Sequence, residues 1–160
     1  MTTKIPPRRF LLIAATATSL ALAGCGSSSS TTSSGLSRAQ LAVKVNAACR
    51  SYDTAANAIP QPNDFATNPA AAAAYLDKLK KLANSTFVTV TALQPDSSVK
   101  SDFTKYVADE TRNIGYLVSA DAKAHAKDPS GLKDLEAAAR FKSTTIVPLD
   151  RKLGFTSCIK

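Results

Sequence analysis

The chain has 160 residues, with 20 Lys and Arg against 12 Asp and Glu, and a formal net charge of +8. A single histidine excludes zinc or iron sites built on several histidines. The basic residues are not clustered with aromatic ones and form no known recognition motif, so we expect no nucleic acid as a partner.

The first 24 residues are typical of a secretory signal. Lys4, Arg8 and Arg9 carry positive charge, residues 10–22 are apolar, and small residues follow. The apolar run of about 13 residues is shorter than the roughly 20 that a membrane-spanning helix needs. We therefore expect residues 1–24 to be removed, which leaves 17 basic against 12 acidic side chains and a net charge of +5.

The signal ends in Leu22-Ala23-Gly24-Cys25, which resembles the lipobox of bacterial lipoproteins. The resemblance implies cleavage before Cys25, a diacylglycerol on its sulfur and an acyl chain on its new amine. Two or three acyl chains hold a protein stably at a membrane. We therefore expect a protein anchored through Cys25 on the extracytoplasmic side of the cell membrane. The alternative is an ordinary secretory signal with an incidental cysteine.

Residues 25–35 comprise the lipidated cysteine and a tether of Gly, Ser and Thr, and residues 36–160 form one folded domain. The tether has no apolar side chain to bury and is typical of a flexible coil. The mild positive excess of the mature chain makes an anionic envelope polymer or an envelope protein a candidate partner, beside a plain solvated surface.

Apolar residues recur at three- and four-residue steps through the folded domain, which predicts helices throughout. Ser37 followed by Gln40 predicts a capped start for the first helix, which continues to Ile59. Asn68 before Pro69 predicts the start of the second helix, which runs to about Leu93.

Asp96, Ser97 and Ser98 predict the start of a third helix that ends near Lys127. A fourth helix is expected from about residue 131 to 153, with a kink or a separate short helix at Pro148. Gly154-Phe155 is typical of a left-handed helix end with its apolar contact. Four amphipathic helices with short links predict an all-α, up-down-up-down four-helix bundle.

Once Cys25 is assigned to the lipid, Cys49 and Cys158 remain. An even number of cysteines in an exported protein predicts a disulfide between them. Their spacing lacks the pattern of zinc or redox sites. The disulfide would hold the carboxy-terminal segment against the first helix.

Glu110 falls on the apolar stripe of the third helix, where an uncompensated charge is costly. One interpretation places it at the edge of the core, reaching water or paired with Lys142 or Arg151. The other is a ligand pocket in which Glu110, Tyr106 and Tyr52 line a polar gap between the helices.

The catalytic motifs of hydrolases, metalloproteases and phosphate-binding loops do not occur, so we expect no enzyme. We also expect no metal and no cofactor. Haem would lack axial ligands, because Met1 leaves with the signal and His125 is the one histidine. His125, with Asp121 one turn before it, is expected as a surface residue at a helix end.

The whole pattern resembles small actinobacterial lipoproteins, with Ala47-Ala48-Cys49 in the first helix and Leu153-Gly154-Phe155 before Cys158. The resemblance implies an architecture and a location, and no mechanism. We expect a non-catalytic binding or scaffolding module at the cell envelope. The alternative is a carrier or sensor of a small ligand bound inside the helices.

Overall fold

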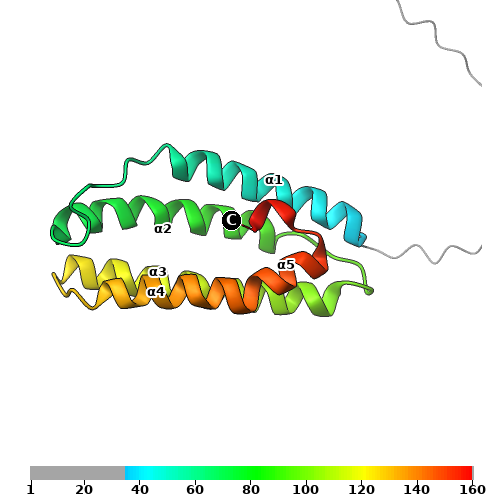
Figure 1. Cartoon of the computed structure of the whole chain (residues 1–160). Coiled ribbons are helices and arrows are strands. Elements are labelled where there is room, and N and C mark those ends of the chain that lie inside the picture. The colour runs from blue at the N-terminus through cyan, green and yellow to red at the C-terminus, as the bar shows by residue number, and fades with distance from the viewer. Residues whose placement is uncertain (1–34, 160) are drawn as a thin grey trace, which may run out of the picture. The chain divides into compact units, whose positions relative to one another are not determined.

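A computed structural model of the protein describes residues 35–159, so the expected signal segment, the expected lipid-bearing Cys25 and most of the tether lie outside it. The described part is all-helical, and its extended pairing is limited to one isolated bridge between Leu36 and Pro95 (Figure 1). The helices in chain order are α1 (Arg38–Asn57), α2 (Pro69–Thr91), α3 (Lys100–His125), α4 (Gly131–Phe141), the π-helix η1 (Lys142–Ile146), α5 (Val147–Leu153) and the 3-10 helix η2 (Thr156–Cys158). The predicted all-α class is confirmed.

The starts of α1 and α2 follow the predicted capping residues. The Ser37 hydroxyl accepts a hydrogen bond from the Gln40 amide, while the Ser37 amide donates to Gln40 Oε1 at 3.0 Å. At the second start, Asn68 Oδ1 accepts from the Ala71 amide at 3.1 Å, and a proline occupies the first helical position. Each cap satisfies a main-chain donor that the first helical turn leaves open.

The start of α3 differs from the prediction. The carboxylate of Asp96 accepts from the main-chain amide of Ser98 at 2.9 Å, so it stabilises a turn ahead of the helix. The residue that caps α3 is Val99, whose side chain makes no capping hydrogen bond. The helix therefore begins at Lys100, later than the Asp and Ser residues indicate.

A short separate helix, α5, contains Pro148 in its first turn, as one of the two expected outcomes has it, and the π-helical turn η1 lies between α4 and α5. Proline has no N–H to donate to the preceding turn, and the chain passes through the π-helical turn η1 just before α5. The helix α5 ends at Gly154, whose φ of 81° is left-handed. The amide of Phe155 donates to the Asp150 carbonyl at 2.8 Å, which closes the predicted helix end.

The long helices pack in the order of the chain. Helix α2 packs against α1 and α3, and α3 also packs against α4 and α5. Consecutive long helices run in alternating directions (Figure 1). The buried core contains these side chains: Leu41, Val45, Val90, Val99, Phe103, Tyr106, Ile146, Leu149, Leu153, Phe155 and Cys158.

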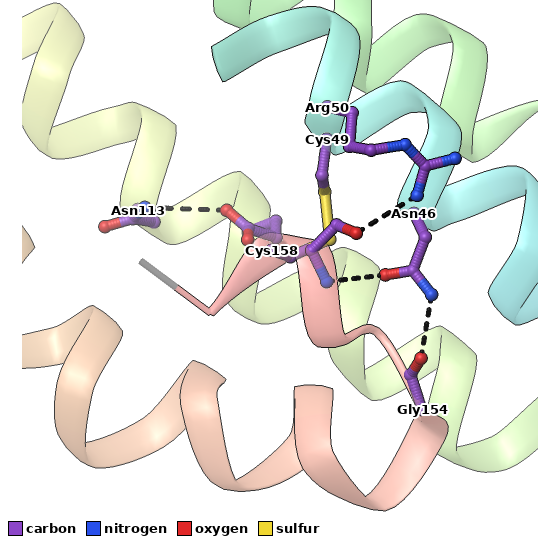
Figure 2. Close-up of a disulfide and its surroundings, with 8 residues drawn as sticks. Asn46, Cys49, Arg50, Asn113, Gly154 and Cys158 are labelled. Carbon is purple, nitrogen blue, oxygen red and sulfur yellow. Dashed lines mark hydrogen bonds between the residues drawn. A yellow bond between two sulfur atoms is a disulfide. The ribbon is translucent and has the colours of Figure 1, made fainter.

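The carboxy-terminal segment lies against α1, where Cys49 and Cys158 form the predicted disulfide. The two Cα atoms are 5.2 Å apart although 109 positions separate them in the sequence. Figure 2 shows Asn46 and Arg50 of α1 beside this link, both hydrogen-bonded to the same carboxy-terminal segment. The predicted cysteine pairing is confirmed.

The described surface carries few large apolar side chains. Val43, Val88 and Val118 are exposed, and each lies on a different helix. Among the described helices, none combines the length and apolar character needed to cross a bilayer.

Candidate ligand pocket

A pocket with a volume of about 300 Å³ lies between the helices. Its wall includes residues of α1, α2, α3, α4, η1 and η2, so it is built only when the whole domain has folded. Its volume lies at the lower end of the range of about 300–1,000 Å³ that is usual for small-molecule sites. The lining residues are Cys49, Tyr52, Asp53, Ala83, Thr86, Phe87, Val90, Tyr106, Glu110, Asn113, Ile114, Leu117, Leu135, Ala138, Ala139, Lys142 and Cys158.

The three residues that the sequence singled out for a pocket all lie on this wall. Tyr52 comes from α1, and Tyr106 and Glu110 come from neighbouring turns of α3. The ring of Tyr106 is almost fully buried and packs edge-on against Phe155, with ring centres 5.0 Å apart. The fold thus brings side chains 54 to 58 positions apart in sequence to one cavity.

Glu110 is half-buried, and its environment disfavours the charged form. Burial raises the pKa of its carboxyl group, while the charge of Lys142 and a hydrogen bond from Asn113 oppose the shift. Within the described part of the chain, Glu110 forms no ion pair, so the pairing with Lys142 or Arg151, which one interpretation gave as an alternative to reaching water, does not occur. Lys142 lies on the same pocket wall but acts at longer range.

Asn113 is a pocket residue that the sequence analysis missed. Its Nδ2 donates to Glu110 Oε2 at 3.5 Å, as Figure 2 shows for the labelled Asn113. Its Oδ1 is buried and accepts no hydrogen bond from the described residues. Asn113 lies three positions after Glu110, so both residues lie on one face of α3. This spacing is the sequence signal that would have indicated Asn113 as a pocket residue.

Asp150 is a second residue that was missed; it does not line the pocket, but it interacts electrostatically with Glu110 and Lys142, which do. It is 0% exposed, and neither carboxylate oxygen has a hydrogen-bond partner among the described residues. Burial, reinforced by the charge of Glu110 and opposed by Lys142, raises the pKa of Asp150 to about 7. Its position one turn after Ile146 and one turn before Leu153 puts it on the apolar stripe, a signal that was present in the sequence.

The wall of the pocket has the chemistry of a binding site. Asp53 and Glu110 supply two carboxylates, Lys142 one ammonium and Asn113 one amide, and most other lining side chains are apolar or aromatic. The disulfide between Cys49 and Cys158 forms part of the wall, so its sulfurs are not free thiols. A mostly apolar cavity with a few polar groups is typical of sites that hold and orient a small molecule.

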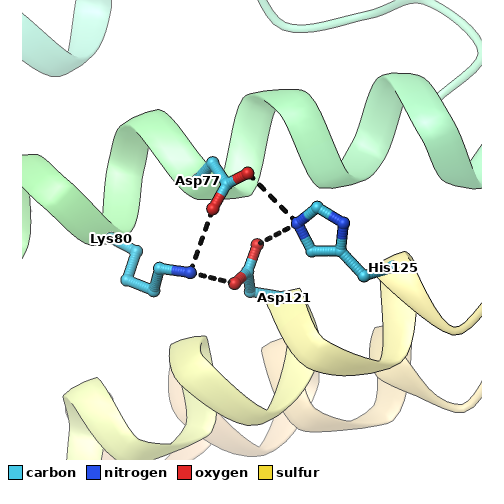
Figure 3. A network of polar contacts seen from close by, with 4 residues as sticks. All are labelled: Asp77, Lys80, Asp121 and His125. Atoms are coloured by element: carbon cyan, nitrogen blue, oxygen red, sulfur yellow. Dashed lines mark hydrogen bonds and ion pairs between the residues drawn. The ribbon is translucent and has the colours of Figure 1, made fainter.

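A second polar cluster lies between α2 and α3, away from this wall (Figure 3). The ammonium of Lys80 contacts the carboxylates of Asp77, at 3.0 Å, and of Asp121. His125 Nε2 lies 3.1 Å from Asp77 Oδ2 and 3.6 Å from Asp121 Oδ1. Lys80 follows Asp77 by three positions, so the two side chains lie on one face of α2.

Three side chains of this cluster, Asp77, Asp121 and His125, are of types that bind metal ions, and they are the group of this kind among the described residues. Ligand atoms of Asp77, Asp121 and His125 lie within 4.8 Å of one another. The Lys80 ammonium already lies against both carboxylates and compensates their charge. The side chain of His125 is 56% exposed, consistent with its predicted place at the end of a helix. The contacts are those of an ion-pair network that links α2 to α3.

Comparison of the chain with protein families, with curated proteins and with solved structures finds no match.

Proposed function

We propose that this protein is a lipid-anchored cell-envelope protein that carries or senses a small ligand held between its helices. The observation that supports the proposal is the pocket of about 300 Å³, whose wall gathers Glu110, Asn113 and Lys142 among apolar side chains. Sequence alone favoured a binding or scaffolding module and gave the small-ligand carrier as the alternative. The pocket now favours the carrier, because a scaffold needs no pocket between its helices with converging polar groups.

The architecture that fits this function is an up-down-up-down four-helix bundle. Helices α1 to α4 alternate in direction and pack in chain order, which is the pattern of such bundles. Bundles commonly build ligand sites in their core from facing helices. The side chains on the pocket wall come from all four of these helices, in agreement with such a site.

The location rests on the first 35 residues. Residues 1–24 are proposed as a lipoprotein signal, Cys25 as the site of lipid attachment, and residues 25–35 as the tether. The resemblance to small actinobacterial lipoproteins supports this assignment. A tethered pocket at the membrane would meet its ligand on the extracytoplasmic side of the cell membrane.

A binding role without catalysis is proposed. The described pocket wall holds no serine, histidine or free thiol. Its carboxylates lie among apolar groups and beside an amide, an arrangement suited to orienting a bound molecule.

The ligand proposal is tested by purifying the lipoprotein from native membranes and identifying released small molecules by mass spectrometry. Ala138 lines the pocket, so Ala138→Leu should fill part of it and remove the co-purified molecule. Ala122 of α3 is exposed and absent from the wall, so Ala122→Leu is the matched control and should retain the molecule. The same molecule on all three proteins, or on none, would contradict the proposal.

The anchor is tested separately by cell fractionation. Cys25→Ser should release the protein from the membrane into the soluble fraction, because the acyl chains lose their attachment point. Retention on the membrane without change would show that the lipid assignment is wrong, and would leave the ligand pocket unaffected.

A further inference from the structure

We infer that the polar cluster between α2 and α3 is a metal site, in which Asp77, Asp121 and His125 bind one zinc(II) ion. A single histidine excludes sites built on several histidines, but a site of one imidazole and two carboxylates needs no second one. The inference replaces the expectation of no metal. It is independent of the ligand pocket, whose wall shares no residue with this cluster.

The three side chains come from two helices and face one another (Figure 3). Asp121 and His125 are four positions apart on α3, so they lie on one face of that helix. Asp77 lies opposite them on α2. The fold thus brings together one ligand from α2 and two from α3, and an ion bound by all three would link the two helices.

The distances within the cluster suit a tetrahedral ion. Zinc binds nitrogen and oxygen ligands at about 2.0–2.2 Å, so two neighbouring ligand atoms of a tetrahedron lie about 3.3–3.6 Å apart. His125 Nε2 lies 3.1 Å from Asp77 Oδ2 and 3.6 Å from Asp121 Oδ1. Ligand atoms of all three residues lie within 4.8 Å of one another, so small side-chain movements are enough to enclose the ion. Water would complete the fourth position.

One oxygen of Asp121 lacks a partner that a metal ion would supply. The side chain of Asp121 is 5% exposed, and its Oδ1 is buried and accepts no hydrogen bond from the described residues. Its distance of 3.6 Å from His125 Nε2 is too long for a hydrogen bond. A buried acceptor without a partner is costly, so a cation between this oxygen and the imidazole gains free energy. The side chain of His125 is 56% exposed and can turn to admit the ion.

Lys80 does not occupy the oxygens that would bind the ion. Its ammonium contacts Asp77 Oδ1 at 3.0 Å and Asp121 Oδ2, whereas His125 lies at the other oxygen of each carboxylate (Figure 3). Carboxylates that bind metals are commonly held by such a second partner, which fixes their orientation. Two carboxylates and one ammonium also leave one net negative charge beside a neutral imidazole, which favours a cation.

The donor set favours zinc over the common hard cations. Calcium takes six to eight oxygen ligands, and magnesium requires six in an octahedron. The cluster offers one nitrogen and two carboxylates, and zinc binds both kinds of ligand in sites of four.

The test is a zinc titration of the untagged, detergent-solubilised lipoprotein, after bound metal has been removed with a chelator and the chelator dialysed away. The chain contains one histidine, so the imidazole NMR signals report on His125 alone. We expect these signals to change and to saturate at one zinc ion per chain, and calorimetry to give the same stoichiometry. A large excess of calcium should leave the signals unchanged.

Matched variants locate the ion. His125→Gln and Asp77→Asn each remove one ligand from an exposed or half-exposed position, and each should weaken zinc binding in calorimetry by at least about tenfold. Asp109 pairs with a lysine on its own helix, as Asp77 does, but lies outside the cluster. Asp109→Asn is therefore the matched control and should bind zinc as the wild type does.

Several results would overturn the inference. These are a wild type that binds no zinc, a His125→Gln variant that binds zinc as tightly as the wild type, and calcium that displaces zinc from the imidazole. Equal weakening by Asp77→Asn and Asp109→Asn would also overturn it, because the ion would then be held by surface charge in general. None of these results bears on the ligand pocket.

Discussion

The side-chain amide of Asn46 donates a hydrogen bond to the main-chain carbonyl of Gly154 at 2.9 Å, although 108 positions separate the two residues. The same side chain accepts a hydrogen bond from the Ser157 amide at 2.8 Å (Figure 2). One residue of α1 thus satisfies two main-chain groups of the segment that ends in Cys158. The attachment of the carboxy-terminal segment therefore has a polar part as well as a covalent one.

Asn46→Ala removes both hydrogen bonds and leaves the Gly154 carbonyl and the Ser157 amide without these partners. We expect a loss of about 1–3 kcal/mol in the free energy of unfolding, because the groups are partly buried. Urea denaturation of both proteins measures it. Asn84→Ala on the exposed face of α2 is the control, with an expected change within about 0.5 kcal/mol. Equal effects of the two variants would contradict the assigned role of Asn46.

Loss of the disulfide should destabilise the domain more than loss of Asn46. The link spans 109 positions, and closing a loop of that length contributes about 4–5 kcal/mol through the unfolded chain. We expect the Cys49→Ala, Cys158→Ala double variant to lose stability of this order in urea denaturation. A reductant should destabilise the wild type to a similar degree and leave the double variant unchanged. A wild-type melting temperature that does not respond to reductant would count against the disulfide.

Lys80 should contribute more to stability than an ordinary surface lysine. Its ammonium contacts Asp77 and Asp121, and the side chain of Asp121 is 5% exposed, so removal of the lysine leaves a buried carboxylate without its cation. Lys105 pairs with Asp109 one turn away on the same helix, and its side chain is 60% exposed. We expect Lys80→Met to lower the melting temperature clearly more than Lys105→Met. Equal shifts in thermal denaturation would refute a special role for Lys80.

Asp150 should make the protein less stable as the pH rises from about 4 to 7. Burial raises its pKa from 3.8 to about 7, so the folded state keeps a proton that the unfolded chain releases in this window. Each such proton lowers the free energy of unfolding by up to about 1.4 kcal/mol per pH unit. Glu110, whose pKa is also raised by burial, acts in the same direction.

The neutral variant Asp150→Asn should flatten this decline between pH 5 and pH 7. Urea denaturation at several pH values measures the slope for each protein. Hydrogen bonds from Lys123 and Ser119 lower the pKa of Asp134. Asp134 therefore affects stability in a different pH range, because its stabilising contribution is lost as the pH falls below about 4. An identical slope in wild type and Asp150→Asn would show that Asp150 is not the titrating group.

Features that depend on neighbours in the chain were predicted well from the sequence. Ser37 and Asn68 cap their helices as expected because capping joins residues two or three positions apart. Pro148 has a fixed φ and no N–H, and Gly154 readily adopts a positive φ, so their effects at helix ends follow from the residue type. The cysteine pairing followed from their even number and the expected compartment, with no need for a fold.

Features that depend on tertiary packing were predicted less well. The carboxylate of Asp96 accepts a hydrogen bond within a turn and does not cap the helix. An Asp residue at this position of the sequence is compatible with either role. The pocket residues Tyr52, Tyr106 and Glu110 were found because polar groups on apolar stripes stand out. Asp150 stands out in the same way and was overlooked, whereas the contact of Lys80 with Asp121 joins two helices across 41 positions and has no local signal.

The most direct test of the ligand pocket is the NMR signal of the Asn113 side-chain amide during a titration with the small molecule released from the native lipoprotein. Asn113 lines the pocket, whereas Asn84 is exposed on α2 and lies outside the wall. We expect the Asn113 amide resonances to shift and to saturate as this molecule is added, while those of Asn84 stay fixed. Saturable binding that leaves the Asn113 signals unmoved would contradict a ligand site in this pocket.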